Sequence, residues 1–344
     1  MKKRIIIIFG GKSFEHDVSI KSAKSILKAI NKEKYEIKLI YINKEGTWYL
    51  CENINKLEDL VPIKDTKIFD NCDCVFPVLH GNYGEDGKLQ GLLDMINIPY
   101  VGCNLISSAI SMDKVFTKII LNNEDILQAK YIAIKKNEYN IDNLKIQIKE
   151  KLGYPCFIKP ANAGSSVGIS KIYHEHELEK NISEAFKYDK KILIEECIYG
   201  REVEIGVLGN DEIIASKVGE VIPGDDFYSY DAKYNSKESM VKIPATISES
   251  LYNKIKETAI KAYKALECSG LSRIDFFIQN ETNKIYLNEI NTLPGFTNIS
   301  MYPQLWQASG ISYGGLVERL IQLALEEFAK EAKIQRKIDL NQVT

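Results

Sequence analysis

Short apolar runs alternate with an amphipathic helix in the first third of the chain, and this alternation is what most restricts the possible folds. Residues 4–9 and 35–42 carry the branched side chains of buried strands, while apolar residues recur at helical spacing across residues 19–30. Another strand is expected at residues 74–78. Strand, helix and strand in this order favour a parallel sheet with right-handed crossovers. Ligands of such sheets bind beyond the carboxyl ends of the strands.

The length of the chain predicts more than one domain. At 344 residues it exceeds the usual size of a single hydrophobic core. We expect an α/β domain with a parallel sheet at residues 1–112 and a lysine-richer α+β segment at residues 113–190. A strand-rich segment at residues 191–330 and a charged tail at residues 331–344 complete the division.

Composition excludes several classes of protein. The chain is 45% hydrophobic and 27% charged with a net charge of −2, which gives no reason to expect binding to nucleic acid or to a membrane. Seven cysteines, an odd number without Cys-x-x-Cys spacing, are expected to be reduced thiols. The apolar run at residues 5–9 is too short for a signal peptide, so we expect a cytoplasmic protein.

Two apolar runs near the C-terminus, residues 272–278 and 285–291, are separated by a short polar segment and predict a hairpin. A strand's period of two would bring four polar side chains together, namely Arg273, Asp275, Glu289 and Asn291. Two carboxylates about 4 Å apart repel by about 4 kcal/mol at an intermediate dielectric, so a cation would stabilise this face. Carboxylate and amide oxygens suit Mg²⁺. An arginine–aspartate ion pair at the sheet rim is an equally good explanation from these residues alone.

Two loops follow predicted strands and are candidates for substrate contacts. The first, residues 9–19, is a glycine turn that carries Glu15 to the start of a helix, where an ionised carboxylate could hold a substrate ammonium group. Capping of that helix explains Glu15 equally well. The second, residues 80–87, is rich in glycine and begins with His80, which is either a substrate contact or a structural hydrogen-bonding residue.

Two later loops are candidates for contacts with phosphate and for a cover. Residues 164–168 contain Ser165 and Ser166 among glycines, so backbone N–H groups and hydroxyls are available to phosphate oxygens. Residues 223–240 are expected to form a long polar loop with clustered aromatic residues, as is typical of active-site covers. Helices are expected at residues 248–266, with Ser248 as the N-cap, and at residues 313–329.

The order and spacing of these motifs resemble the D-alanine–D-alanine ligase family of the ATP-grasp superfamily. The segments that carry the resemblance are residues 9–19, 79–87, 112–114, 158–160, 164–168, 227–234, 272–275 and 288–295. Each segment is weak evidence by itself, but their joint order is specific. The resemblance implies an N-terminal domain followed by a two-lobed ATP-grasp unit, in which ATP lies between two antiparallel sheets.

The resemblance also implies a nucleotide site and a metal site. The nucleotide-binding residues would be Lys114, Lys159, Ser166, Glu195, Glu196, Ile198, Glu202, Phe227, Lys233 and Asn288. Glu195, Glu196 and Ile198 would line the adenine pocket. Asp275, Glu289 and Asn291 would hold Mg²⁺, as two ions, with Mn²⁺ as a substitute.

By the same resemblance the chain would join two D-alanines for peptidoglycan synthesis, and it would form a homodimer. Catalytic roles fall on Glu15, Ser165, Tyr234, Arg273 and Gly295, and substrate contacts on His80, Ser300 and Met301. Relatives with other acceptors differ from this chain at Tyr234 or Met301, which favours D-alanine as the second substrate. A D-serine ligase of the same family and a nucleotide-binding regulator without turnover are the alternatives.

Overall fold

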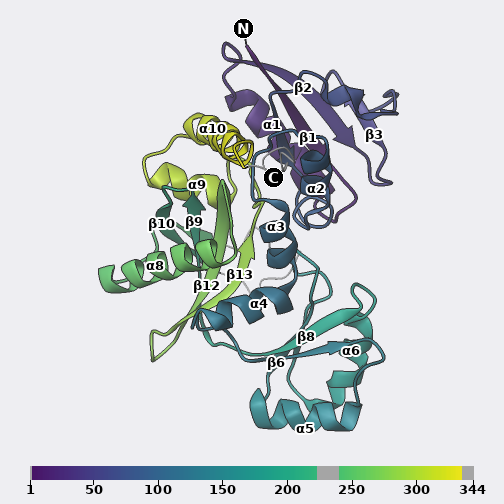
Figure 1. Cartoon of the computed structure of the whole chain (residues 1–344). Coiled ribbons are helices and arrows are strands. Elements are labelled where there is room, and N and C mark those ends of the chain that lie inside the picture. Colours follow the sequence, from purple (N-terminus) through teal and green to yellow (C-terminus); the bar gives the residue numbers. More distant parts are fainter. Residues whose placement is uncertain (1, 223–239, 335–344) are drawn as a thin grey trace, which may run out of the picture.

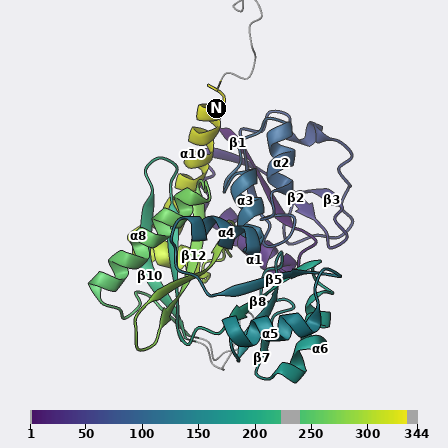
Figure 2. The same ribbon diagram turned by 60° about the horizontal axis from the view of Figure 1, so that its bottom comes forward.

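The computed structural model describes residues 2–222 and 240–334, which form three sheets flanked by helices (Figure 1). The N-terminal sheet lies at one end of the molecule and the central lobe at the other. Figures 1 and 2 both place α5 and α6 on the far side of the central lobe, away from β1 and β2. The predicted α/β class is confirmed, with a mostly parallel sheet followed by antiparallel sheets.

The N-terminal sheet has the strand order β3-β2-β1-β4. Its strands are β1 (Lys3–Gly10), β2 (Tyr35–Ile42), β3 (Trp48–Cys51) and β4 (Cys74–Val78). The helices of this part are α1 (His16–Ala29), the 3-10 helix η1 (Thr66–Phe69), α2 (Lys88–Met95) and α3 (Leu105–Met112). β1 pairs in parallel with both β2 and β4, so the segments that follow β1 and β4 leave the sheet at the same edge.

The central lobe contains an antiparallel sheet in the order β5-β8-β6-β7. Its strands are β5 (Tyr131–Lys135), β6 (Cys156–Pro160), β7 (Ser170–Ile172) and β8 (Lys191–Glu196). Its helices are α4 (Lys114–Asn123), α5 (Ile141–Lys151), η2 (Glu175–Glu177) and α6 (Leu178–Ala185). The domain boundary expected between residues 190 and 191 was misplaced, because β8 pairs with β5 and β6 and belongs to this lobe.

The C-terminal lobe contains a second antiparallel sheet in the order β11-β10-β9-β12-β13. Its strands are β9 (Gly200–Leu208), β10 (Ile214–Ile222), β11 (Met240–Lys242), β12 (Leu271–Gln279) and β13 (Ile285–Asn291). Its helices are α8 (Glu249–Ala265), α9 (Met301–Ala308) and α10 (Tyr313–Glu331). Ser248 caps α8 as expected, since its side chain accepts a hydrogen bond from the backbone N–H of Leu251.

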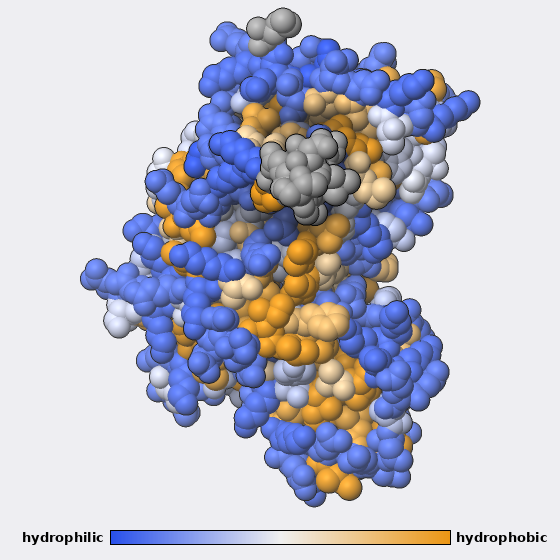
Figure 3. All heavy atoms as spheres, in the orientation of Figure 1, coloured by the Kyte–Doolittle hydropathy of each residue, from blue (hydrophilic) through white to orange (hydrophobic). Residues whose placement is uncertain are grey.

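Hydrophobic side chains are exposed along the middle of one face of the molecule (Figure 3). This face includes α3 and α4, which carry Leu105, Ile106, Phe116 and Ile119 as exposed residues. In the described part of the chain, no helix combines the length and the hydrophobicity that crossing a membrane requires.

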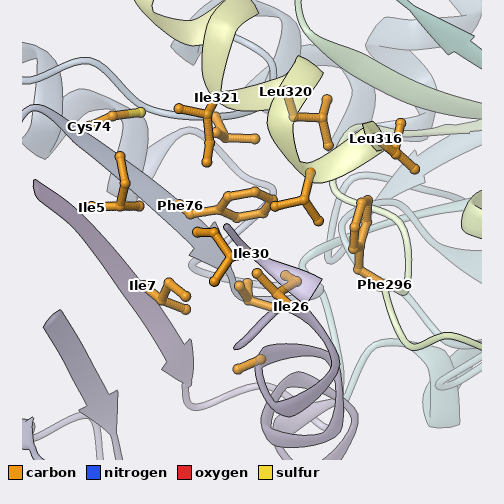
Figure 4. Packing of buried hydrophobic residues seen from close by; sticks show 14 of the residues in the cluster. Ile5, Ile7, Ile26, Ile30, Cys74, Phe76, Phe296, Leu316, Leu320 and Ile321 are labelled. Atoms are coloured by element: carbon orange, nitrogen blue, oxygen red, sulfur yellow. The ribbon is translucent and has the colours of Figure 1, made fainter. Parts of the chain in front are cut away.

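The N-terminal and C-terminal parts share a hydrophobic core. Phe76 on β4 and Ile26 on α1 pack with Leu320 on α10 and with Phe296 from the segment that follows β13 (Figure 4). The Phe296 ring contacts those of Phe76 and Tyr302, with centroids 6.1 and 6.0 Å away. This packing holds the segment after β13 against the carboxyl-end loops of the N-terminal sheet.

Candidate active site

A polar cavity of about 460 Å³ lies where the three parts of the chain meet, a volume within the range of small-molecule sites. Many of the residues predicted from the sequence line it, namely Glu15, Lys114, Ser165, Arg273, Glu289, Asn291, Gly295, Ser300 and Met301. They come from the segment after β1, from α4, from the loop between β6 and β7, and from the C-terminal sheet and its following segment. Segments far apart in the sequence therefore converge on one space.

Glu15 lies on the N-terminal wall of this cavity. Gly10 and Gly11, with φ of 93° and 98°, make the turn that follows β1, and glycine is the residue best suited to that conformation. Glu15 precedes α1, yet its side chain makes no capping hydrogen bond to that helix. A Cβ atom on Gly81 would lie 2.8 Å from the Glu15 Oε2, so the carboxylate packs directly against the loop after β4. The position of the Glu15 side chain therefore favours a role in binding within the cavity over a role in capping α1.

His80 is buried and both of its ring nitrogens have protein partners. Its Nδ1 lies 2.8 Å from the Leu293 carbonyl, and its Nε2 lies 3.1 Å from the Ser22 hydroxyl. Ser22 also accepts a hydrogen bond from the backbone N–H of Phe296. Burial lowers the pKa of His80, so a neutral ring that donates from Nδ1 and accepts at Nε2 fits these partners. The contacts favour the structural explanation of His80 over a direct substrate contact.

Glu85, which was not predicted from the sequence, supports the same segment from the glycine-rich loop. Its Oε2 accepts the N–H of Gly81 at 2.7 Å, and its Oε1 accepts the N–H of Leu293 at 2.8 Å. The carboxylate therefore joins the loop after β4 to the segment that carries Gly295. Burial raises the pKa of Glu85 to about 8, and the nearby charge of Glu15 adds to that increase.

A Glu85→Gln variant is expected to change how stability depends on pH. Because the folded-state pKa is about 8 against an ordinary 4.5, the folded protein binds a proton at Glu85 between these values and the unfolded chain does not. This contribution to stability is complete below pH 4.5 and is lost as pH rises towards 8. The free energy of unfolding of the native protein should thus decline relative to that of the variant across this interval.

Urea denaturation at several pH values between 5 and 8.5 measures this difference. Glu58→Gln, which changes an exposed glutamate, serves as the matched control and should run parallel to the native protein. Parallel curves for Glu85→Gln as well would show that Glu85 does not titrate in this range.

The predicted hairpin forms from β12 and β13, and Asp275 is paired in register with Glu289. Arg273 donates to both oxygens of Asp275, from Nε at 2.8 Å and from an Nη at 2.7 Å. Asn291 donates its amide to the same carboxylate at 3.0 Å. The arginine–aspartate ion pair considered from the sequence is therefore present, but it is buried on an inner strand of the sheet and not at its rim.

The donor atoms here fit a divalent ion that also binds phosphate. Asp275 and Glu289 supply carboxylates and Asn291 an amide oxygen, which are the hard ligands that Mg²⁺ accepts alongside water and phosphate oxygens. Within residues 2–222 and 240–334, no three Asp, Glu, His or Cys side chains are grouped as a metal site. An ion held here would therefore depend on Asn291 and on substrate oxygens as well as on the two carboxylates.

A second charged cluster lies in the central lobe. The Glu195 carboxylate receives Lys118 Nζ at 2.8 Å and Lys159 Nζ at 2.5 Å, and Lys159 also lies 3.5 Å from the Asn288 amide oxygen on β13. Burial alone would raise the pKa of Glu195, but the two lysines lower it to about 2. Lys118 was not predicted from the sequence, although it stands one helical turn after Lys114 on α4.

The Glu195 side chain therefore faces the lysines and is buried, rather than lining an open adenine pocket. Glu196 accepts the backbone N–H of Lys130 at 2.8 Å, whereas Ile198 and Glu202 are partly exposed near the junction of β8 and β9. Lys114 donates to the Ala163 carbonyl at 2.7 Å, beside the serine-containing loop. The contact of Lys159 on β6 with Asn288 on β13 thus joins the two antiparallel sheets.

The loop between β6 and β7 has an unusual backbone. Ser165 and Ser166 have φ of 51° and 58°, a region that residues other than glycine seldom occupy. Asn162, whose contacts the sequence left open, donates to Asp189 through its backbone and its side chain. Phe227, Lys233 and Tyr234, together with most of the expected cover loop, lie outside the described residues.

Two antiparallel sheets, with lysines on one and carboxylate and amide oxygens suited to Mg²⁺ on the other, are the arrangement of ligases of the ATP-grasp class. Family models described as "D-ala D-ala ligase N-terminus" and "D-ala D-ala ligase C-terminus" match residues 4–103 and 120–322. The chain belongs to the D-alanine–D-alanine ligase family.

Individual relatives match over nearly their whole length. A D-alanine–D-alanine ligase from Acetivibrio thermocellus is 47% identical, with 96% of this chain and 98% of the relative aligned. The structure of the D-alanine–D-alanine ligase from Coxiella burnetii has a TM-score of 0.89 at 35% identity and covers 100% of this chain and 99% of its own. The VanG D-Ala:D-Ser ligase from Enterococcus faecalis has a TM-score of 0.86 at 37% identity and covers 94% of this chain and 100% of its own.

Proposed function

We propose that the protein joins two D-alanine molecules into D-alanyl-D-alanine, with conversion of ATP to ADP and phosphate. The observation that carries this proposal is the cavity that places Glu15, Arg273 and Gly295 around one space in a chain of this family. The product would be a building block of peptidoglycan, and we expect the reaction to take place in the cytoplasm.

The chemistry must overcome the poor reactivity of a carboxylate as an acyl donor. Transfer of the γ-phosphoryl group to the carboxylate of the first D-alanine forms a carbon–oxygen–phosphorus linkage, breaks the bond to ADP and gives an acyl phosphate. The amine of the second D-alanine then attacks the acyl carbon. The carbon–nitrogen bond forms, inorganic phosphate leaves, and the amide product remains.

The protein's own residues would bind and orient these groups. Glu15 is suited to hold the ammonium group of the first substrate, because its carboxylate lies on the cavity wall. Arg273 and the backbone N–H of Gly295 are suited to stabilise the oxyanion of the tetrahedral intermediate. Ser300, whose hydroxyl bonds to Thr297, and its neighbour Met301 line the same cavity and would contact the second substrate.

The nucleotide would lie between the two antiparallel sheets. Lys114 and Lys159 would contact its phosphates, Glu202 its ribose, and the backbone near Glu196 and Ile198 its adenine. Asp275, Glu289 and Asn291 would hold Mg²⁺, as two ions, with Mn²⁺ as a substitute. A bound divalent ion neutralises phosphate charge during the transfer.

A direct assay tests the activity. The protein incubated with D-alanine, ATP and Mg²⁺ should release ADP, phosphate and dipeptide in equal amounts, as measured by chromatography of the products. Addition of D-serine in competition distinguishes the alternative acceptor, since a D-alanyl-D-serine ligase would form the mixed dipeptide preferentially. Nucleotide binding without any product would instead favour a regulator.

We also propose a homodimer. The exposed hydrophobic side chains on α3 and α4 offer a surface for a second copy of the chain (Figure 3). Sedimentation velocity measures the assembly, and a monomer at micromolar concentration would contradict this proposal.

A further inference from the structure

The Asp275 carboxylate has two roles that compete for the same atoms. Arg273 occupies both of its oxygens, at 2.8 and 2.7 Å, and Asn291 adds a third hydrogen bond. The proposed function requires Asp275 as a ligand of the metal ion. A cation bound there would repel the guanidinium and take up lone pairs that Arg273 now uses.

Arg273 has a second anionic partner on the adjacent strand. The Glu204 Oε2 lies 2.8 Å from the Arg273 Nε, and the two side chains are only 7% and 16% exposed. Glu204 on β9 is paired in register with Asp275 on β12, so the guanidinium lies between carboxylates of neighbouring strands. Glu204 also lines the cavity, together with Arg273 and Glu289.

We propose that Glu204 is a positioning residue that holds the Arg273 guanidinium at the cavity while Asp275 binds the metal ion. With Glu204 present, Arg273 keeps a buried anionic partner after Asp275 is engaged by the ion. If Glu204 were absent, binding of the metal ion to Asp275 would leave the buried guanidinium without a carboxylate partner, which is strongly unfavourable. Glu204 therefore assists metal binding by acting on Arg273.

Glu204 is not expected to be a metal ligand itself. In the portion of the chain that is described, Glu204, Asp275 and Glu289 are not grouped closely enough to form a three-carboxylate site. The Glu204 Oε2 instead forms an ion pair with the guanidinium, while the N–H of the Arg273 Nε donates its hydrogen bond to Asp275.

Binding of Mn²⁺ in the presence of ADP, followed by electron paramagnetic resonance of the free ion, tests the inference directly. Glu204→Gln should weaken Mn²⁺ binding by about tenfold, a loss in the range found when the partners of metal ligands are removed. Glu204→Asp should weaken it less, because it keeps the negative charge although it lacks one methylene of reach. Native-like affinity in Glu204→Gln, which removes the charge, would overturn the proposal.

Two further variants make the result specific. Glu220→Gln removes an equivalent partner from an arginine on the same sheet, since Glu220 binds Arg201 with two contacts of 2.7 Å, and it should leave Mn²⁺ binding unchanged. The inference rests on the proposed metal site, which Asp275→Asn tests separately. Unchanged Mn²⁺ affinity in Asp275→Asn would refute that metal site, whereas a loss there with no loss in either Glu204 variant would refute only the role of Glu204.

Discussion

Replacement of Arg273 with lysine is expected to lower kcat by about 10²- to 10³-fold, the usual cost of losing one donor to a developing oxyanion. Lysine keeps the positive charge that Asp275 and Glu204 require, so the fold should persist. It cannot reproduce the guanidinium, which contacts Asp275 through two nitrogens and Glu204 through Nε. The rates of dipeptide and ADP formation measure the effect.

Arg201→Lys is the matched control for this experiment. Arg201 also binds a carboxylate, that of Glu220, through two nitrogens, but the pair lies outside the cavity lining. Its kcat should remain within about twofold of the native value, as is usual for a change away from the reacting atoms. Equal decreases of kcat in the two variants would mean that Arg273 stabilises the sheet and does not take part in catalysis.

Local signals in the sequence were sufficient for most of the secondary structure. The strands expected at residues 35–42 and 74–78 have those same bounds in β2 and β4. The helix after Ser248 begins where its N-cap predicts, because capping and periodicity depend on residues close together in the chain. The C-terminal helix extends only slightly beyond the predicted end, to Glu331.

The assignment of strands to sheets could not be obtained in the same way. The run that forms β8 has the same apolar character as those of β9 and β10, so its period gave no reason to group it with β5 and β6. The partner of a strand depends on contacts between distant segments, which no local pattern encodes. The boundary near residue 190 was misplaced for this reason.

The residues of the cavity could likewise be predicted where they are close in the sequence and not where their partners are distant. Arg273, Asp275 and Asn291 could be placed together because a hairpin brings close neighbours in the sequence onto one face. Glu85 and Glu204 were missed because their partners, Leu293 and Arg273, are distant in the sequence. The only local feature that marks Glu85 in the sequence is its position in a glycine-rich loop. The corresponding feature of Glu204 is its position within an apolar strand.

A Glu195→Gln substitution is expected to lower the free energy of unfolding by about 3–5 kcal/mol, the usual cost of removing one partner from a buried ion pair. Lys118 and Lys159 both contact this carboxylate, and Lys118 and Glu195 are only 3% and 4% exposed. Glutamine would leave the buried Lys118 and the partly buried Lys159 without their shared anion. The KM for ATP should rise too, since Lys159 would lose the contact that holds it near Asn288.

The effect should also depend on pH in a defined direction. The pKa of Glu195 is lowered to about 2 from 4.5, so its stabilising contribution is complete above pH 4.5 and is lost as pH falls towards 2. Urea denaturation should therefore show a difference between native protein and variant at pH 7 that narrows under acid conditions. Glu318→Gln, which removes a partly exposed partner of Lys34 at 3.0 Å, should cost less than about 1 kcal/mol. Equal and small losses in both variants would contradict the ion-pair account, because only Glu195 neutralises two lysines, of which Lys118 is buried.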